Sequence, residues 1–80
     1  MKVSLQTFAV LKDAFGPTIE IEIQPTSTVA DIFSKLNETY PEKTNLWKRC
    51  RVAVNNRFES IDHPIQNTDS LSIMPPSSGG

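Results

Sequence analysis

The sequence has 80 residues, of which 38% are hydrophobic and 21% are charged, with eight Lys and Arg against nine Asp and Glu. A chain of this length forms one small domain with a thin core, which leaves little volume for an active site of its own. The near-neutral charge, without a long basic stripe, argues against nucleic acid or a membrane as the partner. We therefore expect a protein that works through other proteins.

Two strands are predicted near the N-terminus. Residues 2–8 and 18–24 both alternate between inward and outward positions, which is the pattern of a half-buried strand. Between them, residues 13–17 read Asp-Ala-Phe-Gly-Pro and predict a turn, because Gly accepts a positive φ and Pro fixes the exit. The two strands are expected to form a hairpin. The positions expected to face the core are Val3, Leu5, Thr7, Ile19, Ile21 and Ile23.

A helix is predicted after residues 25–27. Thr28 is the expected N-cap, and Asp31 supplies the acid of a capping box three residues later. Pro41 disfavours helical geometry at the residue before it and ends the helix. Because the helix has a single apolar stripe, it must lie across a sheet. The stripe consists of Val29, Ile32, Phe33, Leu36 and Tyr40.

The C-terminal half predicts three further strands. Residues 42–50 fit either a short second helix or an ordered loop. Residues 51–55 alternate, Asn55-Asn56 suits a tight turn, and residues 57–60 can pair back briefly. Turns are predicted at residues 62–64 and 68–69, before a last strand at residues 70–74. The inward positions are Val52, Val54, Leu71 and Ile73.

This order of elements predicts an α+β fold of the β-grasp (ubiquitin-like) type. We expect a mixed sheet of four to five strands with one main helix packed on one face. The domain is expected to comprise residues 1–74, followed by a flexible C-terminal tail, residues 75–80.

The ending Pro75-Pro76-Ser77-Ser78-Gly79-Gly80 is similar to the PPxxGG terminus of molybdopterin synthase small subunits. A terminal Gly-Gly alone is weak evidence for this family, but here it follows a double proline and the expected order of elements. The resemblance extends over nearly the whole chain. Its other matches are Lys2-Val3, Phe8-Ala9, Thr28-Val29, Val52-Ala53-Val54-Asn55, Asp62-His63-Pro64 and Asp69.

The resemblance implies a sulfur carrier rather than an enzyme in its own right. An adenylating enzyme of the ubiquitin-activating type would use ATP to convert the Gly80 carboxylate into an acyl-adenylate. A sulfur donor protein would then replace the AMP, which converts the C-terminus into a thiocarboxylate. Docked in the molybdopterin synthase large subunit, as part of a heterotetramer, this group would donate sulfur to a pterin precursor. The catalytic pocket would belong to the large subunit, and this chain would bind no cofactor or metal.

The composition of the tail suits chemistry at a chain end. Gly79 and Gly80 lack a Cβ and can adopt backbone angles that other residues avoid, so they fit a narrow channel. Pro75 and Pro76 stiffen the exit and cannot extend the hydrogen-bond ladder of a sheet. The opposing interpretation is an ordinary frayed terminus rich in Ser and Gly.

Three apolar residues, Phe8, Phe58 and Met74, fall on the polar side of their strands and match the subunit-interface positions of the family. Because the first and last strands of this fold are neighbours, Phe8 and Met74 could form one exposed patch, which would be a docking surface. The alternative is scattered surface hydrophobes, which are common. The basic cluster Lys48, Arg49 and Arg51 is interpreted as a solvated rim.

His63 and Cys50 are interpreted as structural. His63 has no second ligand or nucleophile nearby and fits a turn. Cys50 is the sole cysteine, so it forms neither an internal disulfide nor, by itself, a zinc site, and it is expected to be an ordinary thiol. A single cysteine in a small domain is typical of proteins in a reducing compartment. With no long apolar run, and no signal peptide after Met1, the expected location is the cytoplasm.

Three other functions remain open from the sequence. The sulfur carrier of thiamine biosynthesis shares the fold, the terminal Gly-Gly and the activation chemistry, although such carriers usually lack the double proline. A ubiquitin-like protein modifier would form isopeptide bonds, but the tail here lacks the basic residues typical of the ubiquitin terminus. A plain interaction module would carry its Gly-Gly incidentally.

Overall fold

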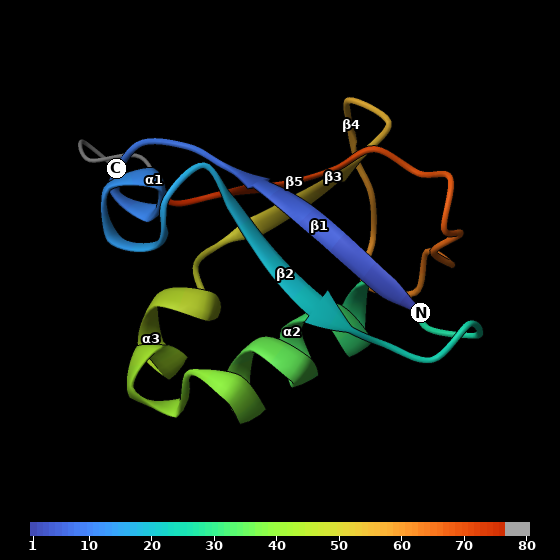
Figure 1. The fold of residues 1–80 in the computed structure, drawn as a ribbon, viewed down its shortest axis with the longest axis horizontal. Helices are drawn as coiled ribbons and strands as arrows, with labels where there is room; N and C mark the ends of the chain where they lie inside the picture. The colour runs from blue at the N-terminus through green and yellow to red at the C-terminus, as the bar shows by residue number, and fades with distance from the viewer. Residues whose placement is uncertain (77–80) are drawn as a thin grey trace.

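The computed structural model describes residues 1–76 and shows a five-stranded mixed sheet with helices packed on one of its faces (Figure 1). The strand order is β2-β1-β5-β3-β4, with β1 and β5 parallel and the other neighbours antiparallel. This is the β-grasp arrangement, so the predicted fold is confirmed. The elements are β1 (Lys2–Thr7), α1 (Val10–Phe15), β2 (Thr18–Glu22), α2 (Val29–Thr39), the short 3-10 helix η1 (Pro41–Lys43), α3 (Thr44–Trp47), β3 (Arg51–Val54), β4 (Arg57–Phe58) and β5 (Leu71–Met74).

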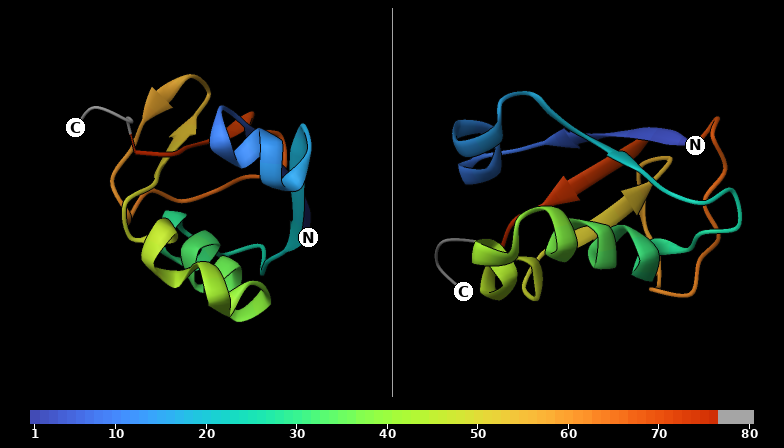
Figure 2. Two further views of the ribbon diagram at one scale, coloured as in Figure 1. Left: turned by 90° about the vertical axis from the view of Figure 1, so that its left-hand side faces the viewer. Right: turned by 60° about the horizontal axis from the view of Figure 1, so that its bottom comes forward.

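The main helix α2 crosses the sheet as predicted, and it is seen with α3 on one face in the two views of Figure 2. At its start, one carboxylate oxygen of Asp31 accepts the backbone N–H of Thr28 at 2.8 Å and the Thr28 hydroxyl at 3.3 Å. The apolar stripe then faces the sheet, which places the core between the two layers. Val29, Ile32 and Leu36 of this stripe are fully covered, and Phe33 and Tyr40 pack at its margin.

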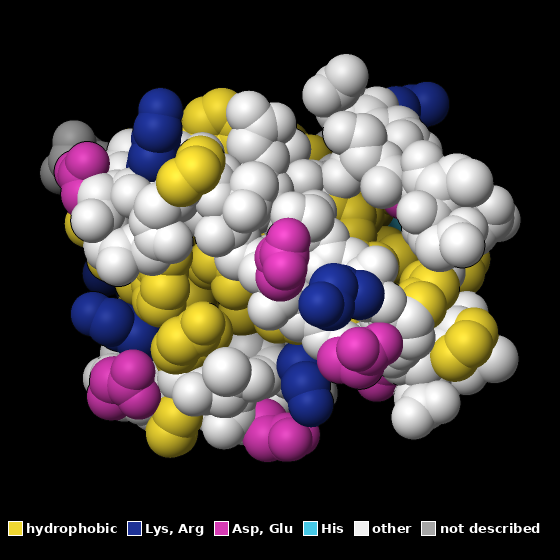
Figure 3. Space-filling model, in the orientation of Figure 1, with side chains coloured by type: hydrophobic (Ala, Val, Ile, Leu, Met, Phe, Trp, Pro, Cys, Tyr) yellow, Lys and Arg dark blue, Asp and Glu magenta, His cyan; other side chains and the backbone are white. Residues whose placement is uncertain are grey.

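Helix α1 was not predicted. The sequence indicates only a turn at residues 13–17, whereas Val10–Phe15 is helical and ends at Gly16, whose φ is 84°. The ring of Phe15 lies 4.9 Å from that of Tyr40 and 5.7 Å from that of Trp47. Figure 3 shows apolar side chains gathered in this region, between α1 and α3. A helix of under two turns has too little periodicity to be recognised, and tertiary packing of this kind stabilises it.

Residues 42–50, which the sequence leaves open, form η1, α3 and a short turn. Trp47 is 1% exposed, and its indole N–H donates to the Tyr40 carbonyl at 3.2 Å. The segment is therefore held by an aromatic anchor whose polar atom is satisfied. Among residues 1–76, no helix combines the length and the apolar character needed to cross a bilayer.

The strands are shorter than predicted at several ends. β1 ends at Thr7, whose hydroxyl donates to the Gly16 carbonyl, and β2 ends at Glu22, although Ile23 remains buried. β4 comprises two residues instead of four. The predicted inward positions are all buried, because alternation survives wherever the backbone stays in the sheet.

His63 directly follows the turn at residues 61–62, and its backbone contacts the start of α2. Its carbonyl accepts the N–H of Val29 at 3.0 Å, and the Ile61 carbonyl accepts the N–H of Ala30 at 2.9 Å. The first turn of α2, which has no helical partners for these donors, is thus satisfied by the loop that precedes β5. The His63 side chain lies 3.0 Å from the Glu59 carboxylate, Nδ1 to Oε2.

Candidate functional site

The face of the sheet opposite α2 carries the predicted docking residues. Residues directly opposite in neighbouring strands project to the same face. The register pairs Gln6 with Ser72, Ser72 with Ala53 and Ala53 with Phe58, so these four residues form one row across β1, β5, β3 and β4. The sheet alternation therefore places Phe58 at the edge of an outer face whose centre consists of two small side chains.

Met74 lies two residues beyond Ser72, in the next row of the same face, where its register partner is Arg51. Phe58 is 48% exposed, and Met74 is half-buried. The structure thus brings Met74 and Phe58 to one face, as the sequence predicted. Their strands are separated by β3 alone.

Phe8 differs from the prediction because β1 ends one residue before it. Its side is therefore not set by strand alternation. The register pairs Thr7 with Ile73, so Phe8 and Met74 each follow one member of a parallel pair. Phe8 lies just past the end of β1, whereas Met74 is the last residue of β5. Phe8 is half-buried rather than exposed. Its backbone follows β1 at the level of the end of β5.

Arg51 belongs to this surface and was missed by the sequence analysis, which placed it in a solvated rim. Its guanidinium carbon lies 3.9 Å from the centre of the Phe58 ring. Stacking of this kind leaves the edge N–H groups of an arginine available to other acceptors. The signal in the sequence was the outward position of Arg51 in β3, combined with the tight turn that folds β4 back beside it.

The two small residues at the centre of the face are buried. Ala53 is 6% exposed and Ser72 is 8% exposed, although alternation places both on the outer side. β3 and β5 are interior strands of the sheet, so larger side chains of the neighbouring strands flank these positions. The centre of the face therefore has short side chains, and the larger side chains of Phe58, Arg51 and Met74 lie beside it.

A polar clasp holds the β3–β4 turn against the start of β5. The side-chain amide of Asn55 donates to Asp69 Oδ1 at 3.0 Å, and Asn55 Oδ1 accepts the N–H of Ser70 at 2.9 Å. Asn55 and Asn56 have φ values of 53° and 69°, as the predicted tight turn requires. The clasp fixes the position of β4, and with it Phe58, relative to β5.

The chain leaves the sheet next to this face. β5 ends at Met74, and Pro75 and Pro76 are half-buried and outside the strand. Proline lacks the N–H that a further ladder bond would need, which accounts for the end of the strand. The predicted site at Gly79 and Gly80 lies outside the described residues, and most of the predicted tail, residues 75–80, lies there with it.

No enzymatic constellation is found in the part of the chain that the structure describes. Within residues 1–76, no group of three His, Cys, Asp or Glu side chains is placed to hold a metal ion. Cys50 is 8% exposed, and burial raises the pKa of its thiol from 9.0 to about 11, opposed by the nearby Arg49 guanidinium. A buried thiol with a raised pKa remains protonated at neutral pH and is a poor nucleophile.

Comparison with known proteins agrees with this geometry. A model of the ThiS family matches residues 5–80. The molybdopterin synthase sulfur carrier subunit of Mycobacterium tuberculosis is 24% identical over 82 residues, covering 100% of this chain and 99% of the relative.

Two solved structures are similar in fold. A putative molybdopterin converting factor, subunit 1, from Pyrococcus furiosus has a TM-score of 0.80 and 22% identity, covering 96% of this chain and 99% of that one. SAMP1 from Haloferax volcanii has a TM-score of 0.78 and 21% identity, with 100% of both chains covered. Because the family model extends over nearly the whole sequence, this chain belongs to the ThiS family of small ubiquitin-like sulfur carriers.

Proposed function

We propose that this chain is the sulfur-carrier subunit of a molybdopterin synthase. The observation that supports the proposal is that Phe58 and Met74 share the outer face, and that β5 ends at Met74, from which Pro75-Pro76 lead to the terminal glycines. A carrier needs both features together, because one surface must dock while the chain end reaches into a partner's active site. The molybdopterin synthase relative supports the choice of complex.

The chemistry takes place on the carboxylate of Gly80. A carboxylate is a poor electrophile, so a partner enzyme transfers AMP from ATP to one of its oxygens and releases pyrophosphate. A sulfur donor then supplies an HS⁻ equivalent to the carbonyl carbon, and AMP leaves. The resulting thiocarboxylate differs from the original carboxylate by one sulfur in place of one oxygen. In the large subunit the sulfur forms a bond to a carbon of the pterin precursor, and water then hydrolyses the acyl–sulfur bond, which restores the Gly80 carboxylate.

The length of the tail limits how far a partner's active site can lie from the end of β5. Six residues follow Met74, and an extended chain covers at most about 3.5 Å per residue, so the reacting carbon lies within roughly 20 Å of the end of β5. A partner that docks on the outer face must place its active site inside that radius. The two prolines reduce the conformational freedom that is lost when the tail enters a channel.

The test is the intact mass of the chain purified from cells that make the molybdenum cofactor. A thiocarboxylate replaces one oxygen by sulfur in the C-terminal peptide and is removed by deleting the genes of the adenylating enzyme. Sulfur transfer to a pterin precursor, in the presence of the large subunit, distinguishes this role from thiamine biosynthesis. Isopeptide conjugates to other proteins would instead support a modifier, and an unmodified terminus would contradict every carrier function.

A further inference from the structure

β2 forms one edge of the sheet, so within residues 1–76 it pairs with β1 alone. Met1 and Ile23 exchange backbone hydrogen bonds in both directions, which makes them a hydrogen-bonded pair of the antiparallel ladder. Such pairs recur at every second residue, so the backbone groups of Ile19, Ile21 and Ile23 point to β1. The backbone groups that point away from the sheet therefore belong to Thr18, Glu20 and Glu22.

The outward edge of β2 is regular. In the part of the chain that the structure describes, the N–H and C=O groups of Thr18, Glu20 and Glu22 form no hydrogen bond with another protein group. The register with β1 is continuous from Thr18 to Glu22, so no bulge interrupts the row. A row of exposed donors and acceptors at strand spacing is a template for a further strand.

A groove of about 440 Å³ lies between this edge and α2. Its helix wall is a stripe of residues spaced by three, one and three positions, which share one face of the helix. The charged groups of this wall are already engaged, because the Asp31 carboxylate caps α2 and Glu38 lies 3.4 Å from Lys35. A strand added to β2 would direct every second side chain into this groove. The stripe consists of Asp31, Ser34, Lys35 and Glu38.

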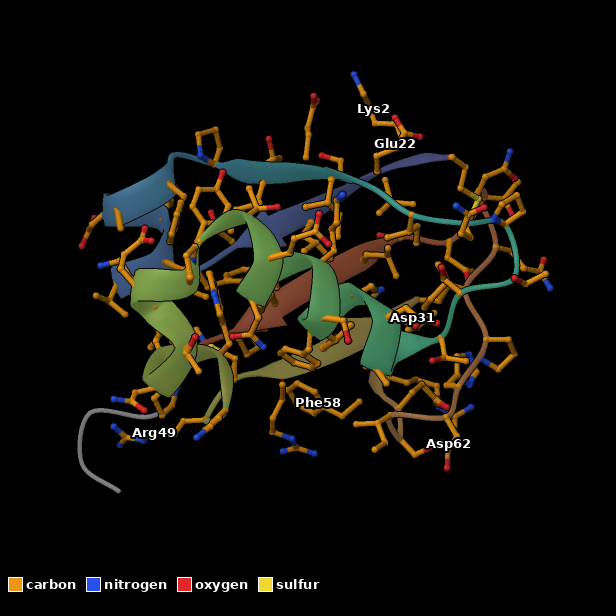
Figure 4. The ribbon with its side chains drawn as sticks, turned by 90° about the horizontal axis from the view of Figure 1, so that it is seen from below. Lys2, Glu22, Asp31, Arg49, Phe58 and Asp62 are labelled. Carbon is orange, nitrogen blue, oxygen red and sulfur yellow. The ribbon has the colours of Figure 1, made fainter. Side chains whose placement is uncertain are left out.

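Acidic side chains border the edge on the opposite face of the sheet, to which Glu20 and Glu22 project. Glu22 is partly neutralised, because its carboxylate lies 3.1 Å from the N-terminal nitrogen and Lys2, seen beside it in Figure 4, is its register partner. Glu20 differs, since its register partner is the uncharged Ser4 and it forms no ion pair within residues 1–76. Its charge is therefore open to a neighbouring strand.

We propose that the β2 edge binds an extended protein segment in which Lys or Arg alternates with apolar residues, added to the sheet as a further strand. The basic side chains lie on the face of Glu20, because opposite charges stabilise directly opposed positions of neighbouring strands. The apolar side chains enter the groove beside α2. A second copy of this chain fits less well, since pairing symmetrical about Glu20 opposes two Glu20 side chains.

This binding site goes beyond the proposed carrier function and does not compete with it. β1 lies between β2 and β5, so a segment bound at the β2 edge leaves the end of β5 uncovered. The tail leaves the sheet at that end of β5. The carrier can thus be held by one protein while its C-terminus reacts in another.

The test titrates the full, ¹⁵N-labelled chain with a synthetic peptide of about nine residues, a usual strand length, in which Lys and Val alternate. We expect amide shifts at Thr18, Glu20 and Glu22, whose hydrogen exchange should slow at least about fivefold. N-methylation of the Lys residues removes the peptide donors that face β2 and should weaken binding at least about tenfold. N-methylation of the Val residues is the matched control, because their N–H groups face away, and should change affinity less than about twofold.

Substitutions in the chain test the same geometry from the other side. Glu20→Pro removes an outward N–H without breaking a bond to β1, and should weaken binding at least about tenfold. Glu20→Lys should weaken binding of the Lys peptide and favour a peptide in which Glu alternates with Val. Asp62→Lys makes the same change of charge on the side away from Glu22 in Figure 4, and should alter affinity less than about twofold. Circular dichroism of each variant checks that the fold is retained.

Three outcomes would overturn the inference. The first is an absence of binding at about 1 mM peptide, and the second is equal binding of the two N-methylated peptides. The third is dimerisation of the chain alone that protects the same three amides, which would assign the edge to a second copy. None of these measurements depends on a thiocarboxylate, so the carrier function stands or falls separately.

Discussion

Thr7 of β1 and Ile73 of β5 are register partners in a parallel pairing, although 65 residues separate them. The residues that follow them, Phe8 just past β1 and Met74 at the end of β5, therefore lie at the same level of the sheet. This relationship joins the N-terminal strand to the exit of the C-terminal tail. It places the predicted docking residues beside the strand end that leads into the tail.

The first prediction concerns the proposed docking surface. Phe58→Asp should weaken binding to the large subunit by more than about 2 kcal/mol, because an exposed aromatic side chain that becomes buried in an interface is typically a hot spot. The free energy of unfolding should change by less than about 0.5 kcal/mol, as expected for an exposed position. Isothermal titration calorimetry and urea unfolding measure the two quantities.

Ile61→Asp is the matched control, since Ile61 is 60% exposed and lies in the loop beside α2 rather than on the outer face. Its binding should stay close to that of the unmodified chain. Equal losses for both variants would mean that the sheet face has no special role. Met74→Asp is expected to weaken binding as well, but its half-buried position makes it a poorer test of docking alone.

The second prediction concerns Gly80. Deleting it, or adding one residue after it, should abolish sulfur transfer, because every proposed step acts on its carboxylate. The melting temperature should not change, since residue 80 follows the last strand by six positions. Mass spectrometry of the C-terminal peptide measures thiocarboxylate formation. Normal cofactor synthesis by either variant would exclude the proposed chemistry.

The third prediction separates access from chemistry at Gly79. This residue provides no reacting atom, so substitution acts through shape or backbone angle. Gly79→Ala should retain partial activity, whereas Gly79→Leu and Gly79→Val should retain almost none, because a β-branched or bulky side chain adds width and resists positive φ. A chemically prepared thiocarboxylate would isolate transfer in the large subunit from adenylation. Transfer at the normal rate by Gly79→Leu would argue against a narrow channel.

The fourth prediction follows from the raised pKa of Cys50. The thiol ionises near 9.0 when unfolded and at about 11 when folded. The unfolded chain therefore loses its proton first, and the stability associated with the buried neutral thiol is present below about pH 9 and lost as the pH rises to about 11. A shift of this size corresponds to on the order of 2 kcal/mol.

Urea unfolding at about pH 8 and about pH 10.5 tests this effect. Cys50→Ala removes the titrating thiol, so the difference in unfolding free energy between the two proteins should change with pH in that window. A difference that stays constant would show that ionisation of Cys50 is not linked to folding. Alkylation of the folded protein by iodoacetamide at neutral pH should be slow compared with a free thiol.

The fifth prediction concerns the clasp between the β3–β4 turn and β5. Asn55→Gly tolerates the positive φ but removes the hydrogen bonds to Asp69 and Ser70, and should destabilise the fold by about 1–2 kcal/mol. Asn56→Gly is the control, because Asn56 has the same type of φ and makes no side-chain hydrogen bond within residues 1–76. It should be neutral or slightly stabilising. Equal effects would assign the role of Asn55 to its backbone angle alone.

Elements with a clear local pattern were predictable without coordinates. The alternation of residues 18–24 identified β2, although the strand stops at Glu22, and the stripe from Val29 with the Thr28 cap identified α2. Both signals arise because one face of each element must be buried, and side-chain periodicity encodes that face directly. The residues that carry the resemblance to molybdopterin synthase small subunits were likewise readable without coordinates.

Features that depend on neighbours distant in sequence were not predictable from local patterns. Helix α1 is anchored by packing of Phe15 against Tyr40 and Trp47, a contact that no local window contains. Ser72 is buried although its face is outward, because β5 lies between β1 and β3. Arg51 appeared to be a solvated cation until the β3–β4 turn brought Phe58 beside it. Periodicity predicts the face of a residue, but its contacts on that face depend on which strands become neighbours.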